Sequence, residues 1–559
     1  MNVNGAAVAG MEWAHGALRY PFLIALCLAF FLPGFFSMPP IDRDEARFAQ
    51  ASRQMLESGD FVNISFQDQP RHKKPAGIYW LQAASASLFG GADAPIWAYR
   101  VPSLVGATGA VLLTAWLGTL AFGGAVGLAA AVALAASLVL GVEARMAKTD
   151  AMLLLIVVAA QGALARAYLA ARDAPPLGLA WIALFWGALG LGILIKGPIV
   201  LLVVGATAGA LAVADRGAPW LRRLRPKLGA AIMLAVALPW LVAIGIATEG
   251  RFFSGSVGGD LWSKLLSGRE SHGAPPGYYL ASFWLTFWPF SLLAGLAVPW
   301  AWARRRAPAV RFCLAWIVPA WLVFELVPTK LPHYTLPLLP AIALIAAAAA
   351  LEPGDGTARR GGWRWWLPAG LFGLVSLALG LALAGLPWIT GDGPRAAVAG
   401  AVAGAAALAT GAAGLAWARR GRPRAVFAAL AGAALVMFAV AYQAVLPALD
   451  AIWLSPRIVA AARGASGCAR PALAAVGYTE PSLVFLAGTQ TVLGDVDAAA
   501  RHLAADPRCG VTAIDARHEA AFAEVARRAG LTTARLATVA GIDYTHGKAA
   551  TIYLHGVAR

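Results

Sequence analysis

The chain has 559 residues, of which 60% are hydrophobic and only 13% are charged. This composition excludes an ordinary soluble protein and indicates many membrane spans. The net charge of +17 could suggest a nucleic-acid partner, but many of the basic residues stand in short loops between apolar segments. There they orient a membrane protein and meet anionic lipid, so we exclude a nucleic-acid-binding function.

The apolar segments predict a polytopic membrane domain. The first run, 20–38, is interpreted as a retained span, because no Ala-x-Ala cleavage pattern follows it. On the order of thirteen segments have the length of about 20 residues that crosses a bilayer. They are 20–38, 99–122, 124–142, 151–171, 178–195, 197–214, 228–247, 277–300, 311–327, 333–350, 365–387, 394–417 and 425–447.

The loops between these segments differ in charge. Arginine and lysine gather in alternate loops, at 216–227, 304–306, 359–364 and 419–424, and the positive-inside rule assigns this side to the cytoplasm. The remaining loops then lie outside, and an odd number of spans also leaves the C-terminal tail outside. These outer loops are 39–98, 143–150, the turn at Lys196, 248–276, 328–332 and 388–393.

The first outer loop has the strongest local pattern. From Asp44 to Glu57 the spacing predicts an amphipathic helix at the membrane surface, which Gly59 ends. Pro75 suits the first turn of a second short helix that runs to Phe89. The expected apolar face holds Phe48, Ala51 and Met55, and the expected polar face holds Arg47, Gln50 and Gln54.

Other ionisable residues gather in the same outer loops, whereas the middles of the spans have almost none. An ion-coupled transporter needs charges at mid-membrane, so this distribution argues against one. It suits an enzyme that acts on a lipid headgroup at the membrane boundary. The residues concerned are Glu143, Arg145, Lys148, Asp150, Lys196, Arg251, Lys330, His333 and Tyr334.

The composition changes after Asp450, and we divide the chain into a membrane domain, 1–448, and an outer α/β domain, 449–559. Short β-prone runs alternate there with helical stretches. No Gly-x-Gly-x-x-Gly pattern is present, so a structural or capping role is expected. The expected strands are 472–478, 510–514, 534–539 and 549–554, and the expected helices are 496–505 and 518–529.

The cysteines divide between the two regions. Cys27 and Cys313 lie in apolar spans and are interpreted as small core residues. Cys468 and Cys509 both lie in the C-terminal domain, each close to an expected strand. An oxidising compartment outside the membrane favours pairing, so we predict a disulfide between Cys468 and Cys509.

Four short motifs on the outer side resemble the ArnT and protein-mannosyltransferase superfamily. They are Asp44-Glu45-Ala46-Arg47, Lys74-Pro75, Lys148-Thr149-Asp150 and Thr329-Lys330-Leu331-Pro332-His333-Tyr334. The resemblance covers roughly residues 20–350 and extends to the order of the spans. It implies an all-α, GT-C type membrane domain and an enzyme that uses a polyprenyl-phosphate sugar as its donor.

The resemblance also implies roles for single residues. Asp44 is the candidate base, while Glu45 points about 100° away on a helix and is expected to pair with Lys74 or to position the loop. The candidate donor phosphate ligands are Lys74, Lys196 and Lys330, with His333 and Tyr334 as hydrogen-bond donors. Supporting roles are expected for Asp150, Lys148, Glu143 and Arg251.

No cofactor is expected to be required. A divalent metal at Glu270 and His272 stays open as an alternative, although these two residues offer fewer ligands than such a site usually has. The aromatic pairs Phe252-Phe253 and Tyr278-Tyr279 are interpreted as interfacial belt residues.

The sequence therefore predicts a glycosyltransferase of the bacterial inner membrane, with its active site in the periplasm. Its donor is expected to be a sugar on undecaprenyl or a related polyprenyl phosphate. Its acceptor is expected to be lipid A, by resemblance to the branch that transfers 4-amino-4-deoxy-L-arabinose. Two alternatives stay open: the same donor with a protein or polysaccharide acceptor, and a flippase or transporter of polyprenyl lipids.

Overall fold

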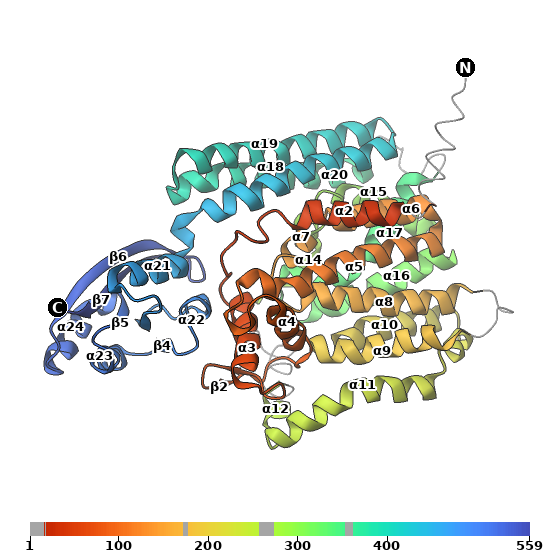
Figure 1. Cartoon of the computed structure of the whole chain (residues 1–559). Coiled ribbons are helices and arrows are strands. Elements are labelled where there is room, and N and C mark those ends of the chain that lie inside the picture. Colours follow the sequence, from red (N-terminus) through yellow and green to blue (C-terminus); the bar gives the residue numbers. More distant parts are fainter. Residues whose placement is uncertain (1–15, 17, 171–176, 257–272, 353–361, 559) are drawn as a thin grey trace.

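A computed structural model of the chain describes residues 16, 18–170, 177–256, 273–352 and 362–558. A large helical domain lies beside a small α/β domain at one end of its helices (Figure 1). The helices run in roughly the same direction, and the α/β domain extends the molecule along that direction. We call the end next to this domain the α/β end of the helical domain.

Each of the predicted membrane segments is mostly helical, and several contain more than one helix. Nine described stretches are long and apolar enough to cross a membrane: α5 (Ile96–Phe122), α8 (Asp150–Leu169), α9 (Leu179–Lys196), α11 (Pro226–Ala247), α16 (Pro308–Leu326), η4 with α17 (Pro332–Leu351), α18 (Trp363–Thr390), α19 (Gly393–Arg419) and Arg424–Ala448, which contains most of α20 (Pro423–Val440). Four shorter apolar helices account for the rest: α2 (Arg19–Phe31), α6 (Gly124–Ala135), α10 (Ile199–Ala214) and α15 (Ser291–Ala303).

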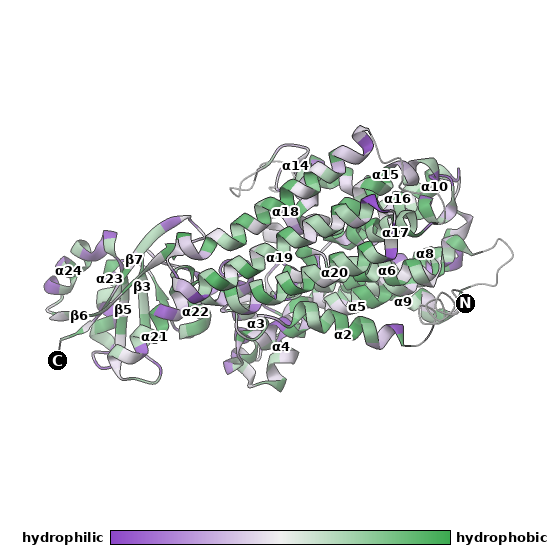
Figure 2. Cartoon of the chain, turned by 90° about the horizontal axis from the view of Figure 1, so that it is seen from above, coloured by the Kyte–Doolittle hydropathy of each residue, from purple (hydrophilic) through white to green (hydrophobic). Residues whose placement is uncertain are grey.

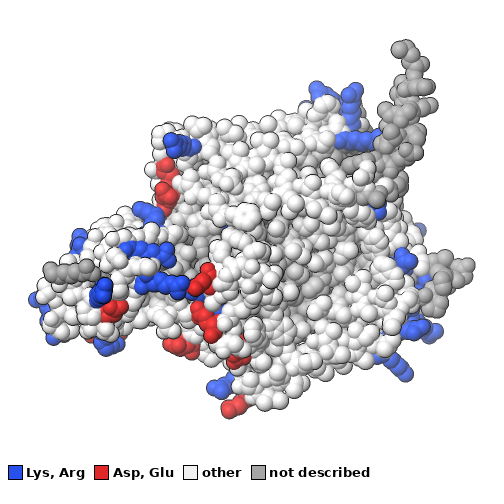
Figure 3. Space-filling model, in the orientation of Figure 1, with Lys and Arg blue, Asp and Glu red and all other residues white. Residues whose placement is uncertain are grey.

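The surface of this domain has the charge distribution of a membrane protein. Figure 3 shows a broad face of the helices without Lys, Arg, Asp or Glu, between two ends where charges gather. Figure 2 shows that the helices are hydrophobic along most of their length. At the end far from the α/β domain, Arg311 pairs with Asp215, and Arg304 pairs with Glu352. The chain is therefore a multi-pass membrane protein.

Short elements connect the long helices. The segment predicted as one span, 277–300, consists of α14 (Tyr278–Thr286) and α15. The connecting elements are α7 (Leu138–Glu143), η2 (Pro219–Leu224), α12 (Arg251–Phe253), η5 (Ala441–Val445), η6 (Leu446–Ala448) and η7 (Asp450–Ile452). Within the stretch Pro332–Leu351, η4 (Pro332–Leu338) leads directly into α17 (Leu339–Leu351).

The first loop contains the two predicted surface helices, α3 (Asp44–Ser58) and α4 (Gly77–Leu88). Two carboxylates in the first turn of α3 suit the positive end of its dipole. Gly59 ends the helix at a φ of 72°, a conformation that glycine adopts without strain. A two-stranded hairpin, β1 (Ser65–Phe66) with β2 (Gln69–Pro70), and the turn η1 (Gly91–Asp93) complete the loop.

The polar face of α3 is not solvated, contrary to the prediction. Gln50 and Gln54 are both buried: the α/β domain contacts Gln50, and the β1–β2 hairpin contacts Gln54 through Ser65 and Gln67. The Gln50 amide donates a hydrogen bond to the Thr489 hydroxyl, over 2.7 Å. The apolar face of α3 therefore packs on the helical core, and its polar face contacts the α/β domain through Gln50.

The C-terminal domain has one mixed sheet in the order β4-β3-β5-β7-β6, in which β3 runs parallel to β4 and β5 and antiparallel pairs join β5 to β7 and β7 to β6. All four predicted strands are present, and the short β4 was not predicted. The strands are β3 (Ala472–Val476), β4 (Val492–Leu493), β5 (Gly510–Asp515), β6 (Thr533–Asp543) and β7 (Lys548–Val557). The helices are α21 (Leu454–Ser466), α22 (Pro481–Ala487), α23 (Val496–Ala505), α24 (Glu519–Arg528) and the short turn η8 (Ala516–His518).

Both faces of this sheet are covered, as the alternation of side chains along its strands shows. Leu473 of β3 packs in the core beneath α21, while Val476 of the same strand packs in the core with α23 and α24. The large helical core ends at Val445 and Leu446, and the small core begins at Leu454. The predicted division at 448 and 449 falls between them.

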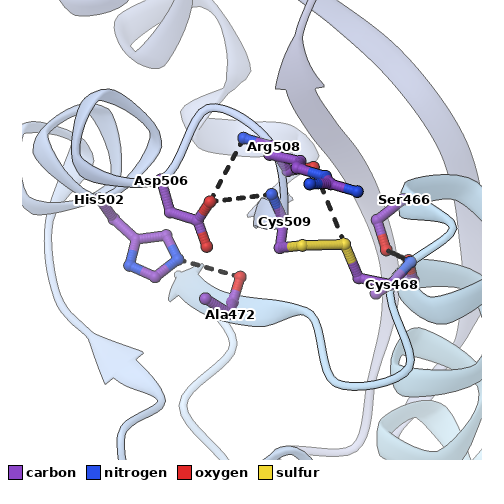
Figure 4. Close-up of a disulfide and its surroundings, with 8 residues drawn as sticks. Ser466, Cys468, Ala472, His502, Asp506, Arg508 and Cys509 are labelled. Carbon is purple, nitrogen blue, oxygen red and sulfur yellow. Dashed lines mark hydrogen bonds between the residues drawn. A yellow bond between two sulfur atoms is a disulfide. The ribbon is translucent and has the colours of Figure 1, made fainter.

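A disulfide joins Cys468 and Cys509 at the edge of this domain, as the sequence predicts (Figure 4). Their Cα atoms lie 5.8 Å apart, because β3 and β5 begin side by side. The Asp506 side chain accepts the backbone N–H of Cys509 over 2.9 Å and so fixes one end of the bridge. Cys27 and Cys313 are free and buried.

Candidate active site

Asp44 opens α3 at the α/β end of the helical domain. Within the described part of the chain, its exposed carboxylate has neither a hydrogen-bond partner nor an ion-pair partner. The crowded surroundings alone would raise its pKa, but the charges of Lys148 and Arg71 outweigh that effect and hold the pKa below its usual value. Asp44 is therefore ionised at neutral pH and open to a ligand.

Glu45 has a different environment: it does not pair with Lys74, and its contacts agree with the alternative expectation that it positions the loop. Its carboxylate is wholly buried and binds Arg100 through two hydrogen bonds of 2.7 and 2.9 Å. The same oxygens accept the backbone N–H groups of Ile41 and Ala147 over 2.8 and 2.9 Å. Because both oxygens are already satisfied, Glu45 is a structural residue.

Arg100 is the residue that sequence reasoning missed here. Its guanidinium also donates to the backbone carbonyls of Phe35, Met38 and Pro39 over 2.9 to 3.0 Å. The pair therefore fixes the chain between α2 and α3. A signal was available, because Arg100 stands at the start of an otherwise apolar segment, where a cation needs a partner.

Three segments that the sequence placed on one side of the membrane meet in a buried ion cluster of Glu143, Lys148, Asp150, Lys196 and His333. The Lys148 ammonium lies 2.9 Å from a Glu143 oxygen and 3.6 Å from an Asp150 oxygen. Lys196 pairs with the other oxygen of Asp150. The His333 ring nitrogens lie 3.6 Å from Glu143 and 3.7 Å from Asp150.

The two carboxylates of this cluster keep the Lys148 ammonium group charged. Burial would lower the pKa of Lys148, but Glu143 and Asp150 outweigh burial and hold that pKa above its usual value. Lys148 is therefore charged, and it also lies close enough to influence Asp44. The arrangement balances two carboxylates with two ammonium groups.

A cavity of about 410 Å³ opens beside the cluster. Its polar lining includes Lys74, Lys196, His333 and Tyr334, and most of its remaining wall is apolar. The Lys196 ammonium also lies 5.4 Å from the centre of the Tyr334 ring. The apolar residues of the lining come from the loop between β2 and α4, from the chain between α8 and α12, from α16 and the residue after it, and from η4. They are Pro75, Leu153, Ile193, Pro198, Ile199, Leu202, Leu241, Phe252, Phe253, Val323, Phe324, Val327 and Pro337.

The sequence predicted that the pairs Phe252-Phe253 and Tyr278-Tyr279 are interfacial belt residues. The structure gives some of them other environments. Phe252 is buried, lines the cavity and packs edge-on against Trp240, with ring centres 5.1 Å apart. Tyr279 is also buried. Only Phe253, which is 39% exposed, combines a cavity contact with an open surface.

Two predicted site residues lie elsewhere. Lys330 is buried, but its ammonium donates to the backbone carbonyls of Ala274 and Val327, each over 2.8 Å, and does not line the cavity. The carbonyls at this turn satisfy the ammonium, so Lys330 fastens two loops together. The side chain of Arg251 is 71% exposed and lies 3.7 Å from Glu249.

Two arginines near Asp44 were not predicted as site residues. Arg71 donates to the Tyr79 hydroxyl over 3.2 Å and stacks on the Phe48 ring. Arg47 stands one turn after Asp44 on α3, and burial together with Arg71 lowers its pKa. The spacing of three residues between Asp44 and Arg47 could have suggested this neighbour.

A metal could in principle use part of the ion cluster. Ligand atoms of Glu143, Asp150 and His333 lie within 4.8 Å of one another, and so do those of Glu480, Asp543 and His546. In the first group the carboxylates already contact two lysines, so a divalent cation would face two positive charges. The donor set therefore fits a metal poorly. Glu270 and His272 lie outside the described residues.

The family pattern described as dolichyl-phosphate-mannose-protein mannosyltransferase matches residues 73–242. Curated relatives named undecaprenyl phosphate-alpha-4-amino-4-deoxy-L-arabinose arabinosyl transferase match a larger part. The relative from Aeromonas salmonicida is 30% identical over 64% of this chain and 65% of its own length. The relative from Yersinia pestis is 28% identical over 61% and 59%. The match thus spans just under two thirds of these relatives.

Solved structures decide the fold. The crystal structure of ArnT from Cupriavidus metallidurans bound to undecaprenyl phosphate is 19% identical, with a TM-score of 0.74 over 97% of this chain and 99% of that one. The chain has the fold of ArnT. The apo crystal structure of the same protein gives a TM-score of 0.73. The predicted resemblance to the ArnT and protein-mannosyltransferase superfamily, with its GT-C type fold, is confirmed.

Proposed function

We propose that the chain is a glycosyltransferase that moves a sugar from a polyprenyl phosphate to an acceptor at the outer face of a bacterial inner membrane. The observation that carries this proposal is a largely apolar cavity with Lys74 and Lys196 in its lining, whose other lining residues His333 and Asp150 lie close enough to influence the Asp44 carboxylate. Cations suit a phosphate, and apolar walls suit a lipid chain. The names of the relatives support undecaprenyl phosphate as the carrier and 4-amino-4-deoxy-L-arabinose as the sugar.

The donor's phosphate is assigned to the lysine side of the cavity. Transfer breaks the bond between the sugar's anomeric carbon and a phosphate oxygen, and negative charge grows on the departing phosphate. Lys74 and Lys196 would stabilise that charge, with His333 and Tyr334 as hydrogen-bond donors. Asp150 holds Lys196 and the pair of Glu143 and Lys148 packs beside it, so these three residues orient the phosphate ligands.

Asp44 is assigned to the acceptor. If the acceptor is a hydroxyl group, its proton moves to the Asp44 carboxylate as the new bond to the anomeric carbon forms. If the acceptor is an ionised phosphate of lipid A, there is little proton to remove. Asp44 then orients the acceptor or stabilises positive charge on the sugar ring.

The side of the membrane follows from two observations. Lys and Arg side chains gather at the end of the helices far from the α/β domain (Figure 3), and the positive-inside rule favours the cytoplasm for that end. The α/β domain contains a disulfide, which suits an oxidising compartment. Both support a periplasmic location of the candidate active site and the C-terminal domain.

A protein acceptor is the second candidate, and the description of the matching family favours it. A polysaccharide acceptor and a polyprenyl-lipid flippase are less well supported. Translocation needs polar groups at several depths of the membrane. The ion cluster and the lysines of the cavity instead gather at one end of the helices.

Transfer is proposed to need no resident metal, because two lysines already balance the two carboxylates of the ion cluster. Activity that survives chelation by EDTA is the expected result. Loss of activity on chelation, with recovery after Mg²⁺ or Zn²⁺ is added, would contradict this part of the proposal.

The function is tested by incubating the purified protein with polyprenyl-phosphate sugars and, separately, with lipid A or a Ser/Thr-rich peptide. Mass spectrometry of each acceptor reports the transfer. We expect lipid A to gain the mass of one aminoarabinose residue when the donor is undecaprenyl phosphate-aminoarabinose. A gain of mass on the peptide alone would support the second candidate. No gain of mass on any acceptor would contradict the proposal that the chain is a glycosyltransferase.

A further inference from the structure

The direction of the Asp44 side chain depends on the backbone that precedes it. No hydrogen bond to another described residue fixes the carboxylate itself, although the residue stands at the first position of α3. The chain from Ile41 to Arg43 therefore decides where Asp44 points. Ile41 is tied to Glu45 by its N–H, and the Arg43 carbonyl accepts the Arg47 N–H over 3.2 Å, which leaves the Asp42 backbone N–H and the Arg43 side chain to make other contacts.

Arg43 has an unusual conformation. Its φ is 64° and its ψ is −99°, outside the regions that a residue with a side chain normally adopts. Such a conformation persists only where surrounding contacts determine it, and it is often found next to functional groups. The contacts of Arg43 and Asp42 therefore need an explanation.

Those contacts come from the α/β domain, roughly 500 residues further along the chain. The N–H of Asp42 donates to the Tyr544 hydroxyl over 2.7 Å, and the Arg43 guanidinium donates to the backbone carbonyl of Thr545 over 2.9 Å. The Asp42 carboxylate accepts the N–H of Ser482, in the first turn of α22, over 3.0 Å. Three contacts thus hold two consecutive residues.

The turn that makes two of these contacts is itself well fixed. It joins β6 to β7, and the Asp543 carboxylate accepts the N–H groups of Thr545 and His546 over 3.1 and 3.2 Å. The Thr545 hydroxyl reaches both Asp543 and Glu480. Because these hydrogen bonds fix the turn, it can hold Asp42 and Arg43 in place and does not simply move with them.

We propose that the β6–β7 turn is a positioning element of the active site, which clamps Asp42 and Arg43 and thereby fixes the direction of the Asp44 carboxylate. This inference rests on the proposed function for its catalytic part. It gives the C-terminal domain a role that its sequence did not reveal. Tyr544 is the main positioning residue, because its hydroxyl holds the Asp42 backbone directly.

The first test does not depend on transfer. Hydrogen–deuterium exchange is measured on the purified full chain and on Tyr544→Phe, which removes only the hydroxyl that accepts the Asp42 N–H. We expect exchange across residues 42–44 to become about tenfold faster, with no change in α5. Tyr553→Phe is the matched control, since Tyr553 packs on Arg535 in the same sheet, away from Asp42. Unchanged exchange in Tyr544→Phe would overturn the clamp.

The second test measures transfer kinetics in the same variants. Because small displacements of a catalytic group can cost about 100-fold in rate, kcat should fall by up to that factor in Tyr544→Phe. The KM for the donor and the thermal stability should stay near the wild-type values, as should all properties of Tyr553→Phe. Faster exchange with an unchanged kcat would overturn the positioning role.

The two proposals can fail separately. If the wild-type chain transfers no sugar, the proposed function fails, while the exchange measurement still decides the clamp. Arg43→Lys serves as a conservative variant beside Arg43→Ala. Lysine can still donate to the Thr545 carbonyl and should retain more of the wild-type protection of residues 42–44. Equal protection in both Arg43 variants would contradict a contribution from this side chain.

Discussion

Two groups of buried charges lie at the same end of the helical domain, and they differ in whether their polar groups are accessible to a ligand. The Glu45–Arg100 pair is closed: neither side chain is exposed, and its hydrogen-bonding groups are used by the protein. The ion cluster of Glu143, Lys148, Asp150, Lys196 and His333 opens onto a cavity. A closed pair fixes the fold, whereas an open cluster can exchange part of its interactions for a ligand.

Neighbouring residues of one helix show the same contrast. Asp44 and Glu45 look equivalent in the sequence, yet Glu45 is completely enclosed and Asp44 is open. Residue type alone therefore says little about function at this site. What distinguishes the two carboxylates is whether the protein has already satisfied them.

The largest expected effect concerns the open carboxylate. Asp44→Asn keeps the shape of the side chain but removes its charge, so transfer should fall by about 10²–10⁴-fold. Thermal stability should stay near that of the wild type, since no hydrogen bond between described residues is lost. Steady-state transfer kinetics and a melting curve check both parts. Wild-type turnover in this variant would remove Asp44 from the site.

The closed pair should behave in the opposite way. Glu45→Ala leaves Arg100 buried without its carboxylate, which typically costs about 3–5 kcal/mol of stability. We expect a lower melting temperature and poor expression, and near-normal donor affinity in whatever protein folds. Thermal unfolding in detergent measures the change. A stable but inactive Glu45→Ala protein would mean that Glu45 belongs with the catalytic residues after all.

Lys74 tests the open side of the cavity. A charge-assisted hydrogen bond is worth about 1.5–3 kcal/mol, so Lys74→Ala should weaken donor binding by about ten- to 100-fold. Lys74→Arg should recover only part of that affinity, because a planar guanidinium differs in shape and hydration from an ammonium. Equilibrium binding of undecaprenyl phosphate gives the answer. Equal affinity in all three proteins would make Lys74 an interfacial anchor.

The smallest expected effect is a pH dependence where the two domains meet. Burial raises the pKa of Asp42 to about 6 from an ordinary value of 3.8, and Glu480 adds to that effect while Ser482 opposes it. Since the folded state holds this proton more tightly, the contribution of Asp42 to stability is complete below pH 3.8 and is lost as the pH rises through 6. We expect a change of about 1 kcal/mol, because Asp42 is partly exposed.

Asp42→Asn removes this titration and keeps an oxygen for the Ser482 N–H. Melting temperatures of the wild type and the variant, measured from pH 4 to pH 7, should therefore diverge, with the variant gaining on the wild type up to pH 6 and not above it. A constant difference across this range would show that Asp42 does not titrate there.

Much of the fold could be predicted because the bilayer restricts what an apolar segment can do. Stretches such as 99–122 and 365–387 have one plausible structure, and α5 and α18 match them closely. The strands of the C-terminal domain were predictable from their β-prone composition. The covering of α3 by that domain was not, because Gln50 looks like a solvated residue until its partner surface is known.

The candidate site was predicted in part. Polar residues that share one side of a membrane have few places to gather, which is why 143–150, Lys196 and His333 meet. The sequence could not distinguish Lys196, which lines the cavity, from Lys330, which binds two backbone carbonyls. That difference depends on loop geometry, and both lysines precede a turn or proline in the same way.

These two lysines provide the most direct test of the central claim, that the open charges hold the donor phosphate. Undecaprenyl phosphate affinity is measured for Lys196→Met and Lys330→Met, which remove the same charge from a half-buried and a buried position. We expect at least tenfold weaker binding for Lys196→Met, and wild-type binding with reduced thermal stability for Lys330→Met. Equal losses of affinity in both variants, or a loss in Lys330→Met alone, would contradict it.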